Sequence, residues 1–410
     1  MKDKNQKTKD WEIKKLKDVC YVVTDGVHKT PKYTDSGVRF ISIKNIRAYS
    51  PIDFNSYVRY ISQADHEDFS KKAKVEINDI LFPRIGTMGF AKIVDFEEEV
   101  SIFVGLGLAK PNSDIILPKY LEYYMNSDFV YRYSHEKATG SGRKTLSLKF
   151  SREMPVFFPK SLDEQKRIVE ILDEAFENID QAKNIAEQNL KNIEELFESE
   201  LQNIFSNNGD EWERNTLGEV CEMIKRGSAP KYTEKEESTI VLNQKCIRNH
   251  SINYSFSRKH DSSVKKINQE RFIQLGDGLI NSTGVGTLGR VAQVREIEVE
   301  AFVDTHITIV RPKKELFFLD FFGWILIFIE NKIKESGEGA SGQTELSRTK
   351  LEDEFYVSYP KSITEQQKIV ERLDELKEKV DDGAAILRSK IAALDELKKS
   401  LLQKAFNGEL

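Results

Sequence analysis

Two long segments of the chain repeat apolar residues at steps of three and four, the pattern of a helix with one apolar stripe. The first stripe contains Ile168, Leu172, Ala175, Ile179, Ala182, Ala186, Ile193, Leu196 and Ile204. The second contains Ile369, Leu373, Leu376, Val380, Leu387, Ile391, Leu394 and Leu401. A stripe sustained over about six turns favours a helix that packs along its length against one partner helix. We predict that the two helices pair with each other as an antiparallel coiled coil; pairing between two copies of the chain is the alternative.

The ends of both segments carry residues that start and stop helices. Ser161-Leu162-Asp163-Glu164 and Ser362-Ile363-Thr364-Glu365 have the sequence of capping boxes, in which Ser and Glu satisfy amides of the first turn. Asn207-Asn208-Gly209 and Asn407-Gly408 tolerate the left-handed conformation that ends helices. Each helix should therefore run for about 45 residues and, at about 1.5 Å per residue, reach about 65 Å. Helices of that length would hold two domains apart at a fixed distance.

Before each predicted helix lies a stretch of about 150 residues with short strand-like runs and glycine turns, and the two stretches repeat each other at an offset near 200. The matches are Trp11 with Trp212, Leu16 to Cys20 with Leu217 to Cys221, Pro31 to Thr34 with Pro230 to Thr233, Ile85 to Gly89 with Val285 to Gly289, Leu146-Ser147 with Leu346-Ser347, Glu164-Gln165 with Glu365-Gln366, and Leu172-Asp173 with Leu373-Asp374. A repeat of this length indicates a duplicated domain rather than a solenoid. We predict an α+β fold of two similar mixed α/β domains, each followed by a long helix.

Length and composition agree with a multidomain globular protein. A chain of 410 residues exceeds the size of one hydrophobic core. Its three cysteines have no CxxC spacing, which argues against a disulfide framework or a four-cysteine zinc site and favours the cytoplasm. The charged residues 1–11 do not resemble a signal peptide. The apolar run from Leu316 to Ile329 is shorter than the roughly 20 residues that cross a bilayer, so we interpret it as a buried helix and expect no membrane association.

The net charge of −5 conceals an uneven distribution. The segment 161–205 carries 12 acidic and 4 basic residues, whereas 362–408 carries 9 of each, so the rest of the chain has a net charge of +3. A mildly basic remainder is compatible with nucleic-acid binding, although a free-standing DNA-binding protein usually carries a stronger basic stripe. We therefore expect a partner protein to help neutralise phosphates.

Basic and hydrogen-bonding residues gather at four matching loop-like places in the two repeats. Arg and Lys can bind phosphates or guanine edges, and Asn and Gln can read adenine. Residues shared by the repeats are expected to serve as scaffold or phosphate contacts, whereas differing residues, such as Lys44-Asn45 against Gln244-Lys245, could read different bases. The candidates for DNA binding are Lys29, Lys32, Tyr33, Lys44, Asn45, Arg47, Arg84, Thr87, Arg143, Lys144, Thr145, Arg226, Lys231, Tyr232, Asn243, Gln244, Lys245, Arg248, Thr283, Thr287, Arg290, Gln343 and Arg348.

Motifs that would indicate catalysis fail on their context. Gly284 to Gly289 spells GxGxxG, but the residues after it alternate like a strand, which favours a glycine hairpin over a dinucleotide site. Lys144-Thr145 lacks the spacing of a phosphate-binding P-loop. The six histidines show no metal-ligand spacing, and neither a nucleophile elbow nor an amino-methyltransferase motif occurs. We predict no catalytic residue and no metal site.

Three duplicated motifs together resemble the specificity subunits of type I restriction-modification systems. They are the Trp-x-x-x-x-Leu-x-x-Val openings at Trp11 and Trp212, the Gly-Ser loops that end in Leu146-Ser147 and Leu346-Ser347, and the Pro-x-x-x-x-Glu-Gln-x-x-Ile-Val helix starts at Pro159 and Pro360. Each motif is short, but their order is duplicated and covers essentially the whole chain.

The resemblance implies a DNA-reading subunit without catalytic residues. Residues 1–160 and 209–361 would be target recognition domains that each read one half of a split double-stranded site from the major groove, and 161–208 and 362–410 would be the spacer helices. Two methyltransferase subunits would dock on the chain, and restriction and translocase subunits would join them. S-adenosylmethionine, ATP and Mg²⁺ would bind to those partners, not to this chain. The alternative is a coiled-coil bridging protein with two protein-binding lobes.

Overall fold

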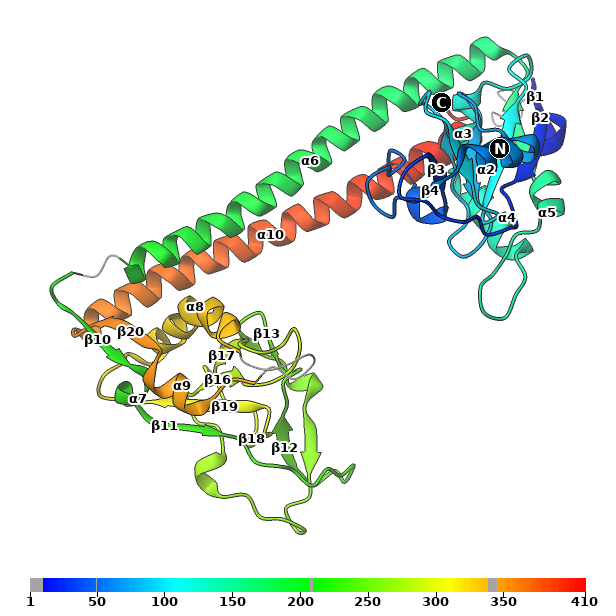
Figure 1. Cartoon of the computed structure of the whole chain (residues 1–410). Helices are drawn as coiled ribbons and strands as arrows, with labels where there is room; N and C mark the ends of the chain where they lie inside the picture. The colour runs from blue at the N-terminus through cyan, green and yellow to red at the C-terminus, as the bar shows by residue number, and fades with distance from the viewer. Residues whose placement is uncertain (1–9, 49, 207–208, 338–344) are drawn as a thin grey trace. The chain divides into compact units, whose positions relative to one another are not determined.

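The structure of the protein is a computed structural model, and it describes residues 10–48, 50–206, 209–337 and 345–410. The chain divides into two compact units, a first unit of Met1–Gln188 with Leu387–Leu410 and a second unit of Asn189–Ile386. Two long helices, α6 (Leu162–Ser206) and α10 (Ile363–Phe406), each contribute residues to both units (Figure 1). Their lengths of 45 and 44 residues match the prediction from the caps and stripes.

The first unit contains a four-stranded antiparallel sheet, a three-stranded mixed sheet and a separate strand pair. The four-stranded sheet has the order β2 (Cys20–Asp25), β8 (Leu106–Pro111), β5 (Ile80–Pro83), β6 (Lys92–Ile93). The three-stranded sheet has the order β4 (Tyr60–Ile61), β3 (Val38–Ile41), β7 (Val100–Ile102), with β3 and β7 parallel. The strand pair is β1 (Trp11–Lys15) with β9 (Pro155–Pro159), and the helices are α2 (Gln63–Ala73), α3 (Pro118–Met125), α4 (Asp128–Lys137) and α5 (Leu148–Arg152).

The second unit repeats the strand order of both sheets and of the strand pair, and adds one short hairpin. Its four-stranded sheet has the order β11 (Cys221–Arg226), β19 (Ile307–Pro312), β16 (Gly278–Asn281), β17 (Val291–Gln293). Its three-stranded sheet has the order β15 (Arg258–His260), β12 (Thr239–Leu242), β18 (Ala301–Val303), and β10 (Trp212–Thr216) pairs with β20 (Tyr356–Pro360). The remaining elements are α7 (Leu217–Val220), α8 (Leu319–Glu335), α9 (Arg348–Asp353) and a hairpin of β13 (Ile247–Arg248) and β14 (Ser251–Ile252). The predicted fold class and duplication are confirmed.

The apolar run that the sequence placed in a buried helix lies mostly in α8, the counterpart of α3 and α4 in the first unit. Phe321, Phe322 and Ile325 are at most 1% exposed, and they pack in one core with Phe197, Leu201 and Phe205 of α6. The first unit has the same arrangement, because Tyr120 and Tyr124 of α3 pack with Phe406 of α10. None of the helices in the described residues is both long enough and apolar enough to span a bilayer.

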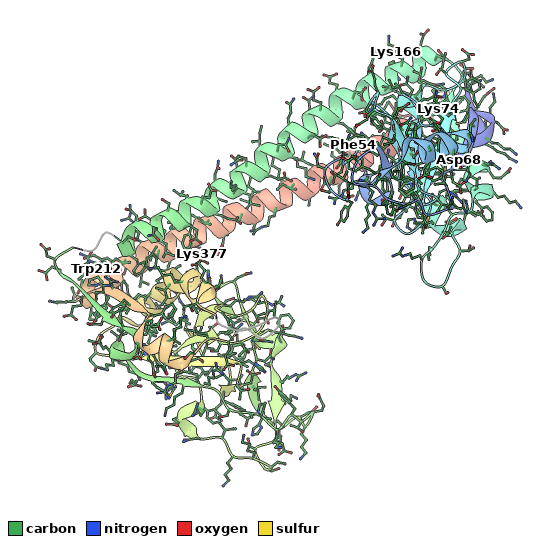
Figure 2. All side chains as sticks on the ribbon, viewed as in Figure 1. Phe54, Asp68, Lys74, Lys166, Trp212 and Lys377 are labelled. Atoms are coloured by element: carbon green, nitrogen blue, oxygen red, sulfur yellow. The ribbon has the colours of Figure 1, made fainter. Side chains whose placement is uncertain are left out.

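The two long helices pair in antiparallel fashion within each unit. In the first unit, Lys183 on α6 forms an ion pair with Asp395 on α10 at 2.7 Å, and Lys398 forms one with Asp180. In the second unit, Arg372 on α10 forms an ion pair with Glu200 on α6. Lys377, labelled in Figure 2, lies 5.8 Å from the centroid of the Phe197 ring. As residue numbers rise along α6 their partners fall along α10, so the predicted helix pairing is confirmed.

Candidate nucleic-acid interface

Several of the repeated sequence motifs have structural roles inside the fold. The Gln165 side chain, which is fully buried, accepts a hydrogen bond from Leu117 N at 2.8 Å and donates to the carbonyls of Ile115 and Pro159. Gln366 makes the equivalent three bonds to Phe318 N, Leu316 O and Pro360 O. Each Glu-Gln motif thus anchors the start of a long helix to the preceding domain.

The other motifs have equally local structural roles. Asp173 accepts a hydrogen bond from the Tyr123 hydroxyl, and its counterpart Asp374 accepts one from Trp324 Nε1 at 3.1 Å. Ser147 and Ser347 accept bonds from backbone amides and cap α5 and α9. Because the side chains of these residues form hydrogen bonds within the fold, the candidates for DNA binding lie in the loops.

The loops after β2 and β11 present predicted residues to solvent. Lys29, Lys32 and Tyr33 in the first unit, and Lys231 and Tyr232 in the second, are exposed. Arg226 at the end of β11 differs from them, because its guanidinium forms an ion pair with Glu345 and donates to the Leu346 carbonyl at 2.7 Å. The five exposed side chains of this set can therefore meet a ligand directly, whereas Arg226 already has partners within its unit.

The turns after β3 and β12 each carry exposed cationic side chains and an asparagine whose side-chain amide bonds to the backbone of the same unit. Lys44, Arg47, Lys245 and Arg248 are exposed. Asn45 is 5% exposed, and its side chain is saturated by Ser42 N at 2.9 Å and by the carbonyls of Asp53 and Ser56. The amide of Asn45 therefore shapes the turn in this conformation.

Backbone hydrogen bonds correct the residue comparison that the sequence suggested for this turn. Asn45 N bonds to Ser42 O at 3.0 Å, and Cys246 N bonds to Asn243 O at 2.8 Å. The register therefore pairs Lys44 with Lys245 and Asn45 with Cys246, not Lys44-Asn45 with Gln244-Lys245. In the second unit Asn243 supplies the turn-closing amide, since its Nδ2 donates to Phe256 O at 2.6 Å.

The glycine hairpins after β5 and β16 differ in length. Leu146 N bonds to Arg84 O, and Leu346 N bonds to Ser282 O, so Ser282 is the counterpart of Arg84 at an offset of 198 residues. Leu146 and Leu346, which lie beyond the hairpins, are 200 residues apart. The second hairpin is therefore two residues longer than the first. Gly284, Gly286 and Gly289 all have positive φ, and β17 follows as a strand, which confirms a hairpin rather than a dinucleotide site.

Most candidates on these hairpins already have partners inside the unit. Thr87 is exposed. In the second unit the Thr283 hydroxyl lies 2.6 Å from His306 Nδ1, Thr287 donates to Gln244 Oε1 at 3.2 Å, and Arg290 donates to Gly286 O at 2.8 Å. These bonds fix the direction of the hairpin and leave Arg290 with further N–H groups to donate.

Arg84 is the candidate most deeply enclosed. It is 7% exposed, forms an ion pair with Asp25, and donates Nε to Leu146 O at 3.1 Å. Lys72 also donates to Asp25. Burial raises the pKa of Asp25, but the hydrogen bond from Lys72 and the charge of Arg84 outweigh it and hold that pKa below its ordinary value.

Arg84 and Arg226 lie at the ends of different strands but make the same kind of hydrogen bond. Each guanidinium donates to the carbonyl of the Leu in a Leu-Ser motif, Leu146 or Leu346, although Arg84 follows β5 and Arg226 ends β11. In this conformation both arginines hold the base of a Gly-Ser loop.

The Gly-Ser loop of the first unit carries the exposed cations Arg143 and Lys144. The backbone of Thr145 bonds to Thr139 in both directions, at 2.8 and 3.0 Å, so the loop closes on itself. Gln343 in the second unit lies outside the described residues, and Arg348 donates to Glu352 at 2.7 Å.

Two arginines, Arg59 and Arg258, are not among the candidates predicted from the sequence. Their guanidinium groups lie 4.5 and 4.6 Å from the ring centroids of Tyr33 and Tyr232. Both are exposed. The signal was present in the sequence, since each arginine follows its tyrosine by 26 residues. Within the described ranges, no group of His, Cys, Asp and Glu side chains could hold a metal ion.

The sequence of this chain is similar to those of known proteins. A domain family described as the type I restriction modification DNA specificity domain matches residues 8–192 and again residues 209–387. The chain is 27% identical over 187 residues to the type I restriction enzyme EcoBI specificity subunit of Escherichia coli. That alignment covers 46% of this chain and 38% of the relative, so it spans less than half of either protein.

Solved structures share the fold. A chain from a structural study of complex assembly and conformational transition of the type I R-M system superposes with a TM-score of 0.75 at 17% identity, covering 98% of both chains. The HsdS subunit from Thermoanaerobacter tengcongensis superposes with a TM-score of 0.55 at 18% identity, covering 98% of this chain and 97% of that one. With two family matches that together span most of its length, the chain belongs to the family of type I restriction-modification DNA specificity proteins.

Proposed function

We propose that this chain is a non-catalytic DNA specificity subunit in which each repeat reads one half of a bipartite double-stranded target. The observation that carries the proposal is the duplication itself: two domains whose sheets share one strand order hold exposed cations at matching loops, while the glycine hairpins after β5 and β16 differ in length. A shared scaffold suits contacts to the uniform phosphate backbone, and local differences suit different base sequences.

The chemistry of methylation and restriction is assigned to partner proteins. Two methyltransferase subunits would dock on this chain and supply S-adenosylmethionine, and restriction and translocase subunits would add ATP and Mg²⁺. The cytoplasm is the proposed place of action, in line with three buried cysteines, Cys20, Cys221 and Cys246, that are all free. The acidic segment 161–205, with its net charge of −8, suits a protein partner better than DNA.

The recognition domains are proposed to be residues 1–160 and 209–361, with spacers at 161–208 and 362–410. The test replaces residues 1–160 by the corresponding domain of another family member and maps methylated adenines in cells that contain the methyltransferase. We expect one half-site to change and the other to remain. A change in both half-sites would contradict the assignment of one half-site to each domain. If the unaltered complex bound no DNA, the proposed function itself would be contradicted.

A further inference from the structure

Each unit carries an exposed arginine stacked on an exposed tyrosine at the same place in its fold. In the first unit, Arg59 lies 4.5 Å from the Tyr33 ring centroid and its Nη1 donates to the Tyr33 hydroxyl at 2.8 Å. In the second unit, Arg258 lies 4.6 Å from the Tyr232 ring centroid. The rings of Tyr33 and Tyr232 are 38% and 50% exposed, so each pair lies at the surface.

Backbone hydrogen bonds establish that the two pairs are equivalent. Thr34 N bonds to Tyr60 O at 3.0 Å, and Thr233 N bonds to Lys259 O at 3.1 Å. These bonds join the residue after each tyrosine to the residue after each arginine. The pair therefore belongs to the duplicated scaffold, not to one repeat alone.

A second cation lies over an aromatic ring two residues before each arginine. Lys44 Nζ lies 4.6 Å from the Tyr57 ring centroid, and the Arg248 guanidinium lies 4.7 Å from the Phe256 ring centroid. Tyr57 and Phe256 are 58% and 39% exposed. Each unit thus presents a second cation on a ring beside its arginine, and in the first unit Arg39 also lies 5.0 Å from the ring centroid of Phe54, which is labelled in Figure 2.

Neither stacked arginine forms a salt bridge within the part of the chain that the structure describes, although burial raises the pKa of the Asp304 carboxyl and the charge of Arg258 works against that rise. No ion pair to Arg59 or Arg258 is found among residues 10–48, 50–206, 209–337 and 345–410, whereas many other exposed arginines, such as Arg132 and Arg167, pair with Asp or Glu. Stacking uses the face of the guanidinium and leaves N–H groups at its edge free to donate to an anion. An ordered guanidinium without a salt-bridge partner loses less entropy on binding a phosphate than a mobile one.

We propose that Arg59 on Tyr33 and Arg258 on Tyr232 form a repeated phosphate clamp that grips the DNA backbone once in each unit. The proposal rests on the DNA-binding function proposed above and adds its contact points. Phosphate is the favoured ligand because the pair is identical in two domains whose turns otherwise differ, and identical residues cannot discriminate different half-sites.

The test measures DNA binding by the full chain, together with its copurifying methyltransferase subunits, as a function of salt. Arg59→Ala and Arg258→Ala should each weaken binding roughly tenfold on both a cognate and an unrelated duplex. Each should also reduce the slope of log affinity against log salt by about 0.9, the value for one lost phosphate contact. Arg59→Lys keeps the charge and should retain the slope while losing part of the affinity.

Arg214→Ala provides a matched control. Arg214 is exposed and lies 5.0 Å from the Tyr356 ring centroid, but the register of β1 and β10 places Ile13 at its position in the first unit, so it is no part of a repeated clamp.

Unchanged affinity and slope in Arg59→Ala and Arg258→Ala, with DNA bound normally by the unaltered complex, would overturn the clamp alone. A loss confined to the cognate duplex would overturn the assignment to phosphate. An unaltered complex that binds no DNA would overturn the proposed function and the clamp with it.

Discussion

At the scale of single residues, the ion pair of Asp25 and Arg84 ties the end of β2 to the start of the glycine hairpin in the first unit. Both side chains are buried, and Asp25→Asn would leave the Arg84 guanidinium without its counter-charge. Breaking a buried pair from one side is strongly destabilising, so we expect the free energy of unfolding to fall by about 3 kcal/mol at pH 7. Urea denaturation of the purified variant and the unaltered chain measures this difference.

The same ion pair predicts an acid dependence with a definite sign. Because the pKa of Asp25 is lower in the folded protein than its ordinary value, its stabilising contribution is complete above about pH 4 and is lost as the pH falls through the folded-state pKa. Asp25→Asn should therefore flatten this part of the stability curve. Glu345→Gln is the control, because Glu345 is 59% exposed in its pair with Arg226 and its loss should cost less than about 1 kcal/mol. Equal losses in the two variants would contradict the role given to burial.

At the scale of elements, the attachment of α10 to the second unit depends on one buried amide. Gln366→Ala removes three hydrogen bonds and leaves Phe318 N and two carbonyls without that partner, so we expect a loss of about 2–3 kcal/mol in the free energy of unfolding. The neighbouring Gln367 is exposed and its side chain donates to Glu371 in the same helix, so Gln367→Ala should change stability by less than about 0.5 kcal/mol. Denaturant titrations of both variants test the contrast, and similar losses would contradict it.

Element ends and pairing faces were predictable because their signals are local. In both helices the serine accepts a bond from the Glu amide, Glu164 N to Ser161 Oγ and Glu365 N to Ser362 Oγ, each at 3.4 Å. The partner of Arg84 was not predictable, because Asp25 lies 59 residues away and no spacing rule joins them. The same limit applies to Asn45: its residue type suits adenine, but only the folded turn reveals that its amide is already saturated.

At the scale of the whole molecule, the spacer role of α6 and α10 can be tested by lengthening both helices together. One heptad inserted after Gln188 in α6 and one after Ile386 in α10 would fall at the division between the two units and leave each unit intact. Seven residues add about 10.5 Å of helix, so the gap between half-sites should lengthen by at most about three base pairs, while both half-sites stay the same. Mapping methylated adenines in cells that carry the variant measures the gap. A heptad in α6 alone would prevent the helix pairs of the first unit, such as Lys183 with Asp395, and those of the second, such as Arg372 with Glu200, from forming at the same time, so that control should lose stability instead. An unchanged gap in the doubly lengthened and stably folded variant would contradict the spacer role, because the two half-site readers would then be set apart by something other than these helices.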